Sequence, residues 1–185
     1  MEKKYKTEKE GNMLRIIALK DFSDVKKGDR GGLVEKEENL SQEGDCWVYE
    51  GAKVSEKSRI CQNAMVCGEA QVYGEASVSG NAKVLGSAQI YGNARVCGDA
   101  QVYYKAKVFG DAEVYENAQV RGKAYVKENA EIYGNAKVYG EARVYGNARV
   151  FGDAEFCGLE IYGEAKVCGN AKVYGGSYGN NTVIN

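Results

Sequence analysis

A six-residue phrase repeats along most of this chain, and the stretch NAKVYGEARVYGNARVFGDA at residues 135 to 154 shows it clearly. The phrase opens on a small residue, first at Cys46 and Ala52 and then at every sixth position from Ala64 to Ala154. A period this short leaves room for only one brief strand and one turn in each repeat. Repetition at this period predicts a β-helix, in which successive repeats stack into a continuous core.

Each position of the phrase has a physical role. Ala and Val stand two residues apart, so in an extended segment both side chains point to the same side, and the residue between them and the Tyr that follows point to the other. The next pair is usually Gly-Asn, Gly-Glu or Gly-Asp, which favours a turn because Gly and Asn tolerate positive φ. If three turns close a triangle, one coil takes 18 residues and coils stack about 4.8 Å apart. The sequence thus predicts an all-β prism of about seven coils with Ala and Val inside.

The residue pattern of the repeat resembles that of a known protein family. Val-Tyr-Gly-Asn-Ala-Lys is similar to the hexapeptide motif of left-handed parallel β-helices, and the left hand is implied by this resemblance alone. The segment from Leu14 to Val54 resembles the start of the YdcK-type β-solenoid proteins of bacteria and their phages, most specifically in ALKDF at 18 to 22, Gly31-Gly32 and the stretch from Asn39 to Val48. The resemblance implies a strand-rich N-terminal cap that leads into a single-stranded, triangular β-solenoid.

Three segments of one domain follow from these patterns. Residues 1–45 are expected to form the N-terminal cap, 46–176 the hexapeptide-repeat solenoid, and 177–185 a C-terminal tail or cap. Open ends of a solenoid expose unpaired strand edges, so a cap with Trp47 nearby is expected at one end and Val183 and Ile184 over the other. The unit AEFCGLEIYGEA is one residue short, which puts Leu159 where Ala should be and predicts a tightened corner rather than a site.

Composition excludes several classes of function. The 25 basic and 26 acidic residues nearly cancel, which gives no electrostatic reason to expect nucleic acid or a membrane surface as a partner. The segment MEKKYKTEKEGN lacks the apolar stretch of a signal peptide, and no apolar run is long enough to span a membrane. We therefore expect a cytoplasmic protein whose six cysteines stay reduced.

Many hexapeptide β-helices are acyltransferases, and the resemblance implies a catalytic histidine and a loop extruded from one corner. The sequence has no histidine, and its repeats run without an insertion from Ala64 to Ala154. We accordingly expect no catalytic residues and no cofactor. An acyl-CoA-dependent acyltransferase whose site forms between subunits, as in the trimers typical of this architecture, is the alternative.

The cysteines and basic residues do not gather into sites. Five cysteines take the outward position usually held by Tyr, namely Cys61, Cys67, Cys97, Cys157 and Cys168, whereas Cys46 takes the inward position. Cys61 and Cys97 stand two coils apart, about 9.6 Å, which is too far for a disulfide or a shared metal.

Basic residues spaced six apart are expected on different faces. Lys137, Arg143 and Arg149 therefore do not form one patch, and one face instead stacks Arg95, Glu113, Glu131 and Arg149 as a column of mixed charge.

Aromatic residues do line up at the coil spacing. One face is predicted to stack Tyr73, Tyr91 and Phe109 and, after Lys127, Tyr145 and Tyr162; a second face is predicted to stack Tyr115, Tyr133 and Phe151. Such ladders stabilise a flat sheet, and they also suit docking of another subunit or protein. Both interpretations stay open, as does a planar small-molecule ligand. The predicted function is a non-enzymatic scaffold that binds a protein partner or itself, with a trimer as the family analogy.

Overall fold

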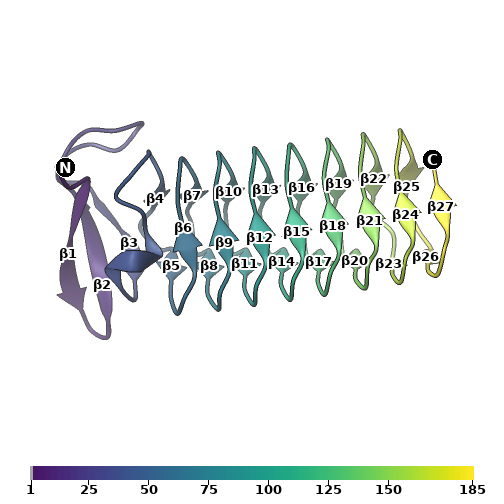
Figure 1. The fold of residues 1–185 in the computed structure, drawn as a ribbon, viewed down its shortest axis with the longest axis horizontal. Helices are drawn as coiled ribbons and strands as arrows, with labels where there is room; N and C mark the ends of the chain where they lie inside the picture. The colour runs from purple at the N-terminus through teal and green to yellow at the C-terminus, as the bar shows by residue number, and fades with distance from the viewer. Residues whose placement is uncertain (1) are drawn as a thin grey trace.

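The computed structural model describes residues 2–185 and shows a straight stack of coils whose three sides are parallel β-sheets. Figure 1 shows the coils as a row, with a hairpin at the N-terminal end and the C-terminus at the opposite end. From Trp47 onward, each coil contributes one two-residue strand to each sheet. The predicted fold class, an all-β parallel solenoid, is confirmed.

The first sheet combines the cap with one side of the solenoid. In spatial order it holds β1 (Tyr5–Glu10), β2 (Met13–Ala18), β3 (Arg30–Val34), β5 (Lys53–Val54), β8 (Gln71–Val72), β11 (Gln89–Ile90), β14 (Lys107–Val108), β17 (Tyr125–Val126), β20 (Arg143–Val144), β23 (Glu160–Ile161) and β26 (Ser177–Tyr178). The strands β1, β2 and β3 pair antiparallel, and every pair from β3 onward is parallel.

Two eight-stranded parallel sheets form the other sides. The second sheet holds β4 (Trp47–Val48), β7 (Met65–Val66), β10 (Lys83–Val84), β13 (Gln101–Val102), β16 (Gln119–Val120), β19 (Lys137–Val138), β22 (Glu155–Phe156) and β25 (Lys172–Val173). The third sheet holds β6 (Arg59–Ile60), β9 (Ser77–Val78), β12 (Arg95–Val96), β15 (Glu113–Val114), β18 (Glu131–Ile132), β21 (Arg149–Val150), β24 (Lys166–Val167) and β27 (Val183–Ile184).

Vertical register follows the 18-residue spacing. Val72 pairs with Ile90, and Ile90 pairs with Val108, so residues three repeats apart lie directly over each other. The backbone bonds are regular: Gln71 N–H donates to the carbonyl of Ala88 at 3.0 Å, and Tyr73 N–H to that of Ile90 at 3.0 Å. The geometric prediction on which the side-chain columns depend is thus confirmed.

The core consists of two side chains from each repeat. Ala and Val of the central repeats, such as Ala106 and Val108, are fully buried, and the residues between them face outward. The small Ala lies beside a turn, where two sheets converge, and the larger Val fills the middle of each side. Apolar burial is therefore continuous along the axis, which is what lets coils too small to fold alone stabilise one another.

Turns use left-handed backbone at the Gly position. Gly92 has φ +70°, and a Cβ on it would lie 2.9 Å from the backbone of Gly110 in the next coil. Where Glu occupies this position, its side chain offsets the strain: Glu116 has φ +58°, and its carboxylate accepts a hydrogen bond from Gly134 N–H at 2.7 Å. Turn residues thus also tie neighbouring coils together.

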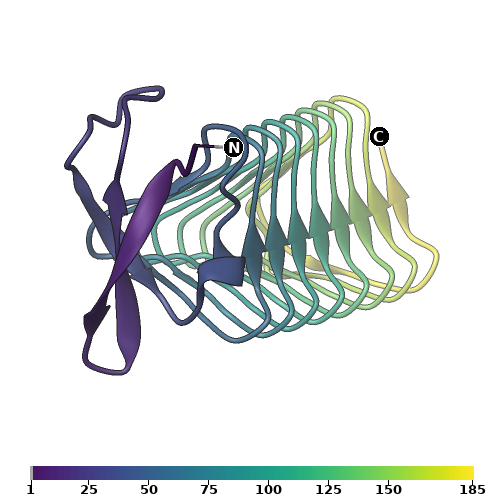
Figure 2. The same ribbon diagram turned by 60° about the vertical axis from the view of Figure 1, so that its left-hand side comes forward.

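The cap closes the N-terminal end of the core. The hairpin of β1 and β2 lies across the first coil (Figure 2), and Trp47, 2% exposed, packs edge-on against Tyr5 and Phe22 with ring centroids 6.2 and 5.4 Å away. The first coil of the solenoid begins before the first repeat that can be recognised in the sequence. Leu40, just after the short 3-10 helix η1 (Glu37–Asn39), bridges to Ile60, a spacing of 20 residues. This coil carries no repeat signature because the hairpin, rather than another coil, covers it.

The shortened unit is accommodated by an exchange of side chains. Leu159 does not take the inward position of Ala as expected: it is 65% exposed. The ring of Phe156, which stands where most repeats have Val, fills the corner instead, and a Cβ on the buried Gly158 would lie 2.4 Å from it. The corner is tightened, and the pairing of Arg143 with Glu160 shows the spacing falling to 17.

The last residues stay in the sheets. Ser177 and Tyr178 of β26 pair with β23, and Val183 and Ile184 of β27 pair with β24, all in parallel register. The residues from 177 onward therefore form sides of a coil.

Within residues 2–185, no helix has the length and apolar character needed to cross a membrane.

The exchange at the short corner predicts a double-mutant effect. Phe156→Val should open a cavity and lower the free energy of unfolding by roughly 2–3 kcal/mol, and an Ala inserted after Leu159 in the native background should overpack the corner and lower the free energy of unfolding by roughly 1–3 kcal/mol. Combined, the two changes restore an ordinary six-residue unit, so the double variant should be more stable than either single one. Urea unfolding measures all three, and strictly additive losses would contradict the account of this corner.

Candidate functional site

The first predicted ladder forms along one edge of the first sheet. The rings of Tyr73 and Tyr91 stack with centroids 4.9 Å apart and planes 1° from parallel, and Tyr91 and Phe109 stack at 4.7 Å and 3°. The column continues through Lys127, whose Nζ lies 4.7 Å from the ring centroid of Tyr145. These side chains lie over one another because each directly follows a strand of the first sheet, where coils are locked in register.

Two further stacks complete the predicted set. Tyr115, Tyr133 and Phe151 stack along the third sheet with both centroid distances at 4.9 Å, and Tyr145 and Tyr162 stack at 5.5 Å in the first column. The slightly larger distance falls where the shortened corner changes the spacing to 17. Every aromatic pairing predicted from the sequence is therefore formed.

The ladder rings are half-buried, because each covers the face of the next and presents its edge and hydroxyl to solvent. Burial raises the pKa of Tyr91 above its usual value, with nearby tyrosines adding to the rise. Tyr115 has a raised pKa for the same main reason, and its hydroxyl donates to the carboxylate of Glu131 at 3.1 Å, which reinforces the shift. The hydroxyls of Tyr91 and Tyr115 are therefore neutral donors at neutral pH, suited to hydrogen bonding at a contact surface.

A third column, along the second sheet, is less regular. The guanidinium of Arg121 in this column lies 4.8 Å from the ring centroid of Tyr139. The Nε atom of Arg121 is buried without a hydrogen-bond partner among the described residues. The same coil spacing that predicts the other ladders also places Tyr103, Arg121 and Tyr139 in one column. Because this column mixes Tyr with Arg, it does not stand out in the sequence as a repeat of one residue type.

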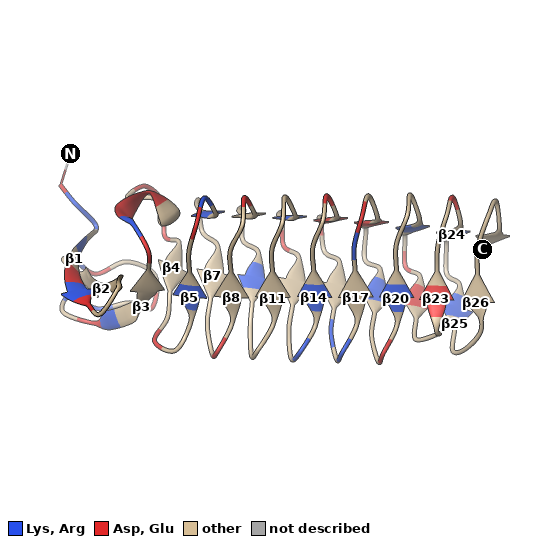
Figure 3. Ribbon diagram, turned by 90° about the horizontal axis from the view of Figure 1, so that it is seen from below, with Lys and Arg blue, Asp and Glu red and all other residues tan. Residues whose placement is uncertain are grey.

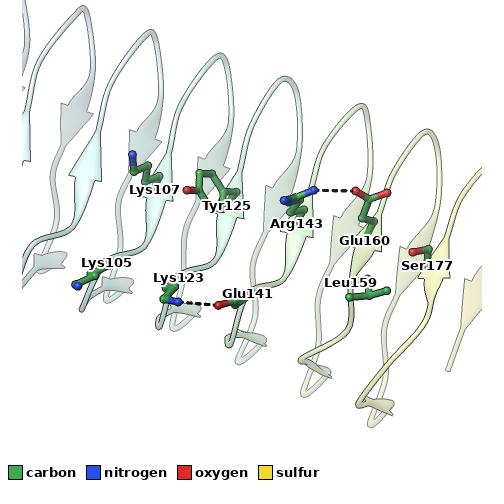
Figure 4. Close-up of a pocket in the computed structure, with 9 residues that line it drawn as sticks. All are labelled: Lys105, Lys107, Lys123, Tyr125, Glu141, Arg143, Leu159, Glu160 and Ser177. Carbon is green, nitrogen blue, oxygen red and sulfur yellow. Dashed lines mark hydrogen bonds and ion pairs between the residues drawn. The ribbon is translucent and has the colours of Figure 1, made fainter.

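A groove of about 670 Å³ runs along the outer face of the first sheet (Figure 4). It is lined by Lys105, Lys107, Lys123, Tyr125, Glu141, Arg143, Leu159, Glu160 and Ser177. Figure 3 shows the basic strands β14 and β20 and the acidic β23 on this face. The groove is not evident from the sequence, because its charged residues lie in two neighbouring columns rather than along a single one.

The groove has a cationic end. Lys123 pairs with Glu141 at 2.7 Å, and Arg143 pairs with Glu160 at 3.4 Å, so these charges offset each other. Within the part of the chain that the structure describes, Lys105 and Lys107 form no ion pair, and Lys107 Nζ lies 5.8 Å from the ring centroid of Tyr125. An incoming carboxylate could bind there without displacing an existing partner.

Tyr104 stands at the edge of this face in a strained conformation. It occupies the Gly position of a turn with φ +61°, and its side chain is 63% exposed. Unlike Glu116, it makes no side-chain hydrogen bond to the next coil among the described residues. Strain held without local compensation is more common at functional sites than elsewhere.

Other residues singled out from the sequence are dispersed. Cys46 is fully buried, all six cysteines are free thiols, and the described residues contain no group of three potential metal ligands. Lys137, Arg143 and Arg149 lie on three different sheets, as predicted.

The mixed-charge column forms in the predicted register. Arg95 pairs in register with Glu113, and Arg149 forms an ion pair with Glu131 at 3.2 Å. The column offers no uniform patch of charge.

Comparison with known proteins agrees with this architecture. The family model described as the YdcK beta solenoid repeat matches residues 88–104 and 142–154. A protein of Escherichia coli (strain K12), named "Uncharacterized acetyltransferase YdcK", is 41% identical over 61 residues, which cover 29% of this chain and 19% of that protein. The match thus spans about a fifth of that relative's length. The structure shows a β-solenoid with 18-residue coils, and within it the matched segments are similar to YdcK-type repeats.

Proposed function

We propose that this chain is a rigid, non-enzymatic binding scaffold that contacts a protein partner through its outward aromatic ladders. The observation that carries the proposal is the first ladder, Tyr73, Tyr91 and Phe109, held in parallel on a flat sheet. Preformed aromatic surfaces lose little conformational entropy on binding, which makes Tyr and Phe effective interface residues.

The cationic end of the groove adds a polar part to the same surface. Lys107 lines the groove and Phe109 belongs to the first ladder. The two side chains point outward from the same strand segment, so the ladder and the groove adjoin. Lys105 and the exposed Tyr104 extend this patch around the turn. A partner segment that carries carboxylates and aromatic or aliphatic side chains would complement both parts.

The partner is either another protein or a second copy of this chain, and the cytoplasm is the compartment we propose. All six cysteines are free thiols, which fits a reducing environment. The three flat faces also fit the trimers that hexapeptide β-helices form by analogy.

We also consider an acyl-CoA-dependent acyltransferase as the alternative function. The name of the Escherichia coli relative favours it. The sequence holds no histidine to act as general base, so an acyl transfer here would need a different base, or a group supplied by a neighbouring subunit.

Replacing Tyr73, Tyr91 and Phe109 together by Ser should weaken partner retention at least about tenfold, because aromatic contacts dominate such interfaces. The measurement compares immobilised native and variant chains exposed to extract of the native host, with light scattering of the free chains to detect self-association. A matched control, Gln71→Ser with Gln89→Ser, alters outward residues on the same strands. Equal losses in both variants would contradict the proposal.

A second variant separates binding from stability. Tyr104→Gly relieves the left-handed strain and should raise the free energy of unfolding by about 1 kcal/mol while removing an exposed aromatic contact. A more stable chain that binds less well would locate part of the contact at this turn. Undiminished binding by this variant would exclude Tyr104 from the surface.

Acetyl-CoA distinguishes the two functions. A scaffold without an acyl-CoA site should show no change of unfolding temperature with saturating acetyl-CoA, since only a ligand that binds the native state stabilises it. Thermal unfolding of the assembled protein, with and without acetyl-CoA, makes the measurement, and desulfo-CoA serves as the matched ligand control. A rise of several degrees would support the acyltransferase and overturn the scaffold.

A further inference from the structure

A lysine and a cysteine are buried together where the cap meets the first coil. Lys4 is 1% exposed and Cys46 is fully buried, and Lys4 Nζ lies 3.3 Å from Cys46 Sγ. The same Nζ donates hydrogen bonds to the carbonyls of Gly44 at 3.0 Å and Cys46 at 2.9 Å. These bonds fix the amine against the sulfur, so the pair is preorganised by the backbone.

Burial moves both side chains toward their neutral forms. It lowers the pKa of Lys4, although the nearby Cys46 and Asp45 oppose this change, and it raises the pKa of the Cys46 thiol, although Lys4 opposes that change. Lysine is seldom fully buried, and the inward position that Cys46 takes is occupied by an apolar Ala in most coils. Neither group takes part in the ladders or the groove.

A hollow of about 650 Å³ opens beside Lys4. It lies between the cap and the first coil, and Lys4, Phe22 and Gly44 are among the residues that line it. Gly44 is the residue whose carbonyl accepts from Lys4 Nζ, so the hollow reaches the hydrogen-bonding shell of the amine. A dissolved gas can approach here although water-exposed surface on the two side chains is negligible.

We propose that Lys4 and Cys46 are an oxidative modification site, at which dioxygen joins Nζ and Sγ through one bridging oxygen atom. The reaction is Lys–NH2 + HS–Cys + O2 → Lys–NH–O–S–Cys + H2O. One N–H and the S–H bond break, an N–O and an O–S bond form, and the second oxygen atom leaves as water with both hydrogens. Nitrogen and sulfur each give up two electrons, and dioxygen accepts all four.

The bridge would act as a redox-sensitive lock on the cap. It joins residues 42 apart in sequence and ties the segment before β1 to the segment before β4. A cross-link of this span restricts the unfolded chain far more than the folded one, which raises stability. Oxidation would thereby fasten the hairpin over the end of the core, where a solenoid is most easily opened.

The arrangement is specific to one cysteine. The remaining cysteines take outward positions, and no hydrogen bond joins any of them to a lysine in the region that the structure describes. Cys97, half-buried on the third sheet, therefore provides an internal comparison for general oxidation.

Mass spectrometry tests the site directly. The full chain is held either in oxygen-saturated buffer or under argon with reductant, then unfolded and digested with a glutamate-specific protease without reduction. The oxygen-treated sample should yield a peptide pair joined through Lys4 and Cys46, heavier than the two peptides together by one oxygen atom and lighter by two hydrogen atoms. Argon treatment should yield the two peptides separately.

Variants then connect the bridge to stability. Cys46→Ala inserts the residue that other coils have at this position, so this variant should fold, form no cross-link and show the same unfolding temperature under both gases. The native chain and Cys97→Ala should both unfold several degrees higher after oxygen treatment.

The native chain alone decides the chemistry, whatever the variants do. Oxygen added to Cys46 with Lys4 left as a free amine would overturn the proposal. So would a pair that stays unmodified in oxygen-saturated buffer, whether or not Cys97 is oxidised.

Discussion

Hydrogen bonds between stacked coils are the interaction on which the rest of this molecule depends. They hold the backbones at the strand spacing, and they repeat at every third unit on all three sides. Whatever residue type recurs at this interval must then stack on itself. The ladders of Tyr and Phe, the corner column in which Asn117 and Asn135 are hydrogen-bonded at 3.1 Å, and the ion pair of Lys137 with Glu155 at 3.1 Å are all consequences of that one constraint.

Much of the architecture could be predicted because the repeat couples sequence position to spatial position. Once 18 residues make a coil, the neighbours of Tyr91 follow by addition, and Tyr73 and Phe109 lie against it as expected. The predictable part ends where that coupling ends. Counting along the repeat predicts that Leu159 points inward. In the structure Leu159 is exposed, because the large ring of Phe156 already fills the corner.

The first coil, the groove and the buried lysine were harder to foresee for related reasons. The coil before Cys46 is defined by contacts with the hairpin, and hairpin packing has no period. The groove joins residues from adjacent columns, so its composition depends on side-chain direction as well as register. Lys4 lies outside the repeat altogether, and its burial against Cys46 arises from how the cap folds back. The repeat predicts that Cys46 points inward, but it carries no information on which residue of the cap lies beside it.

The short unit between Phe156 and Ile161 shows that a coil is defined by its paired strands rather than by a fixed residue count. Pairing on all three sides resumes after the missing residue, because the change in length is absorbed at a corner. In this architecture a missing residue alters one local bend and leaves the downstream faces aligned, so inexact copies of the repeat can still extend a straight solenoid.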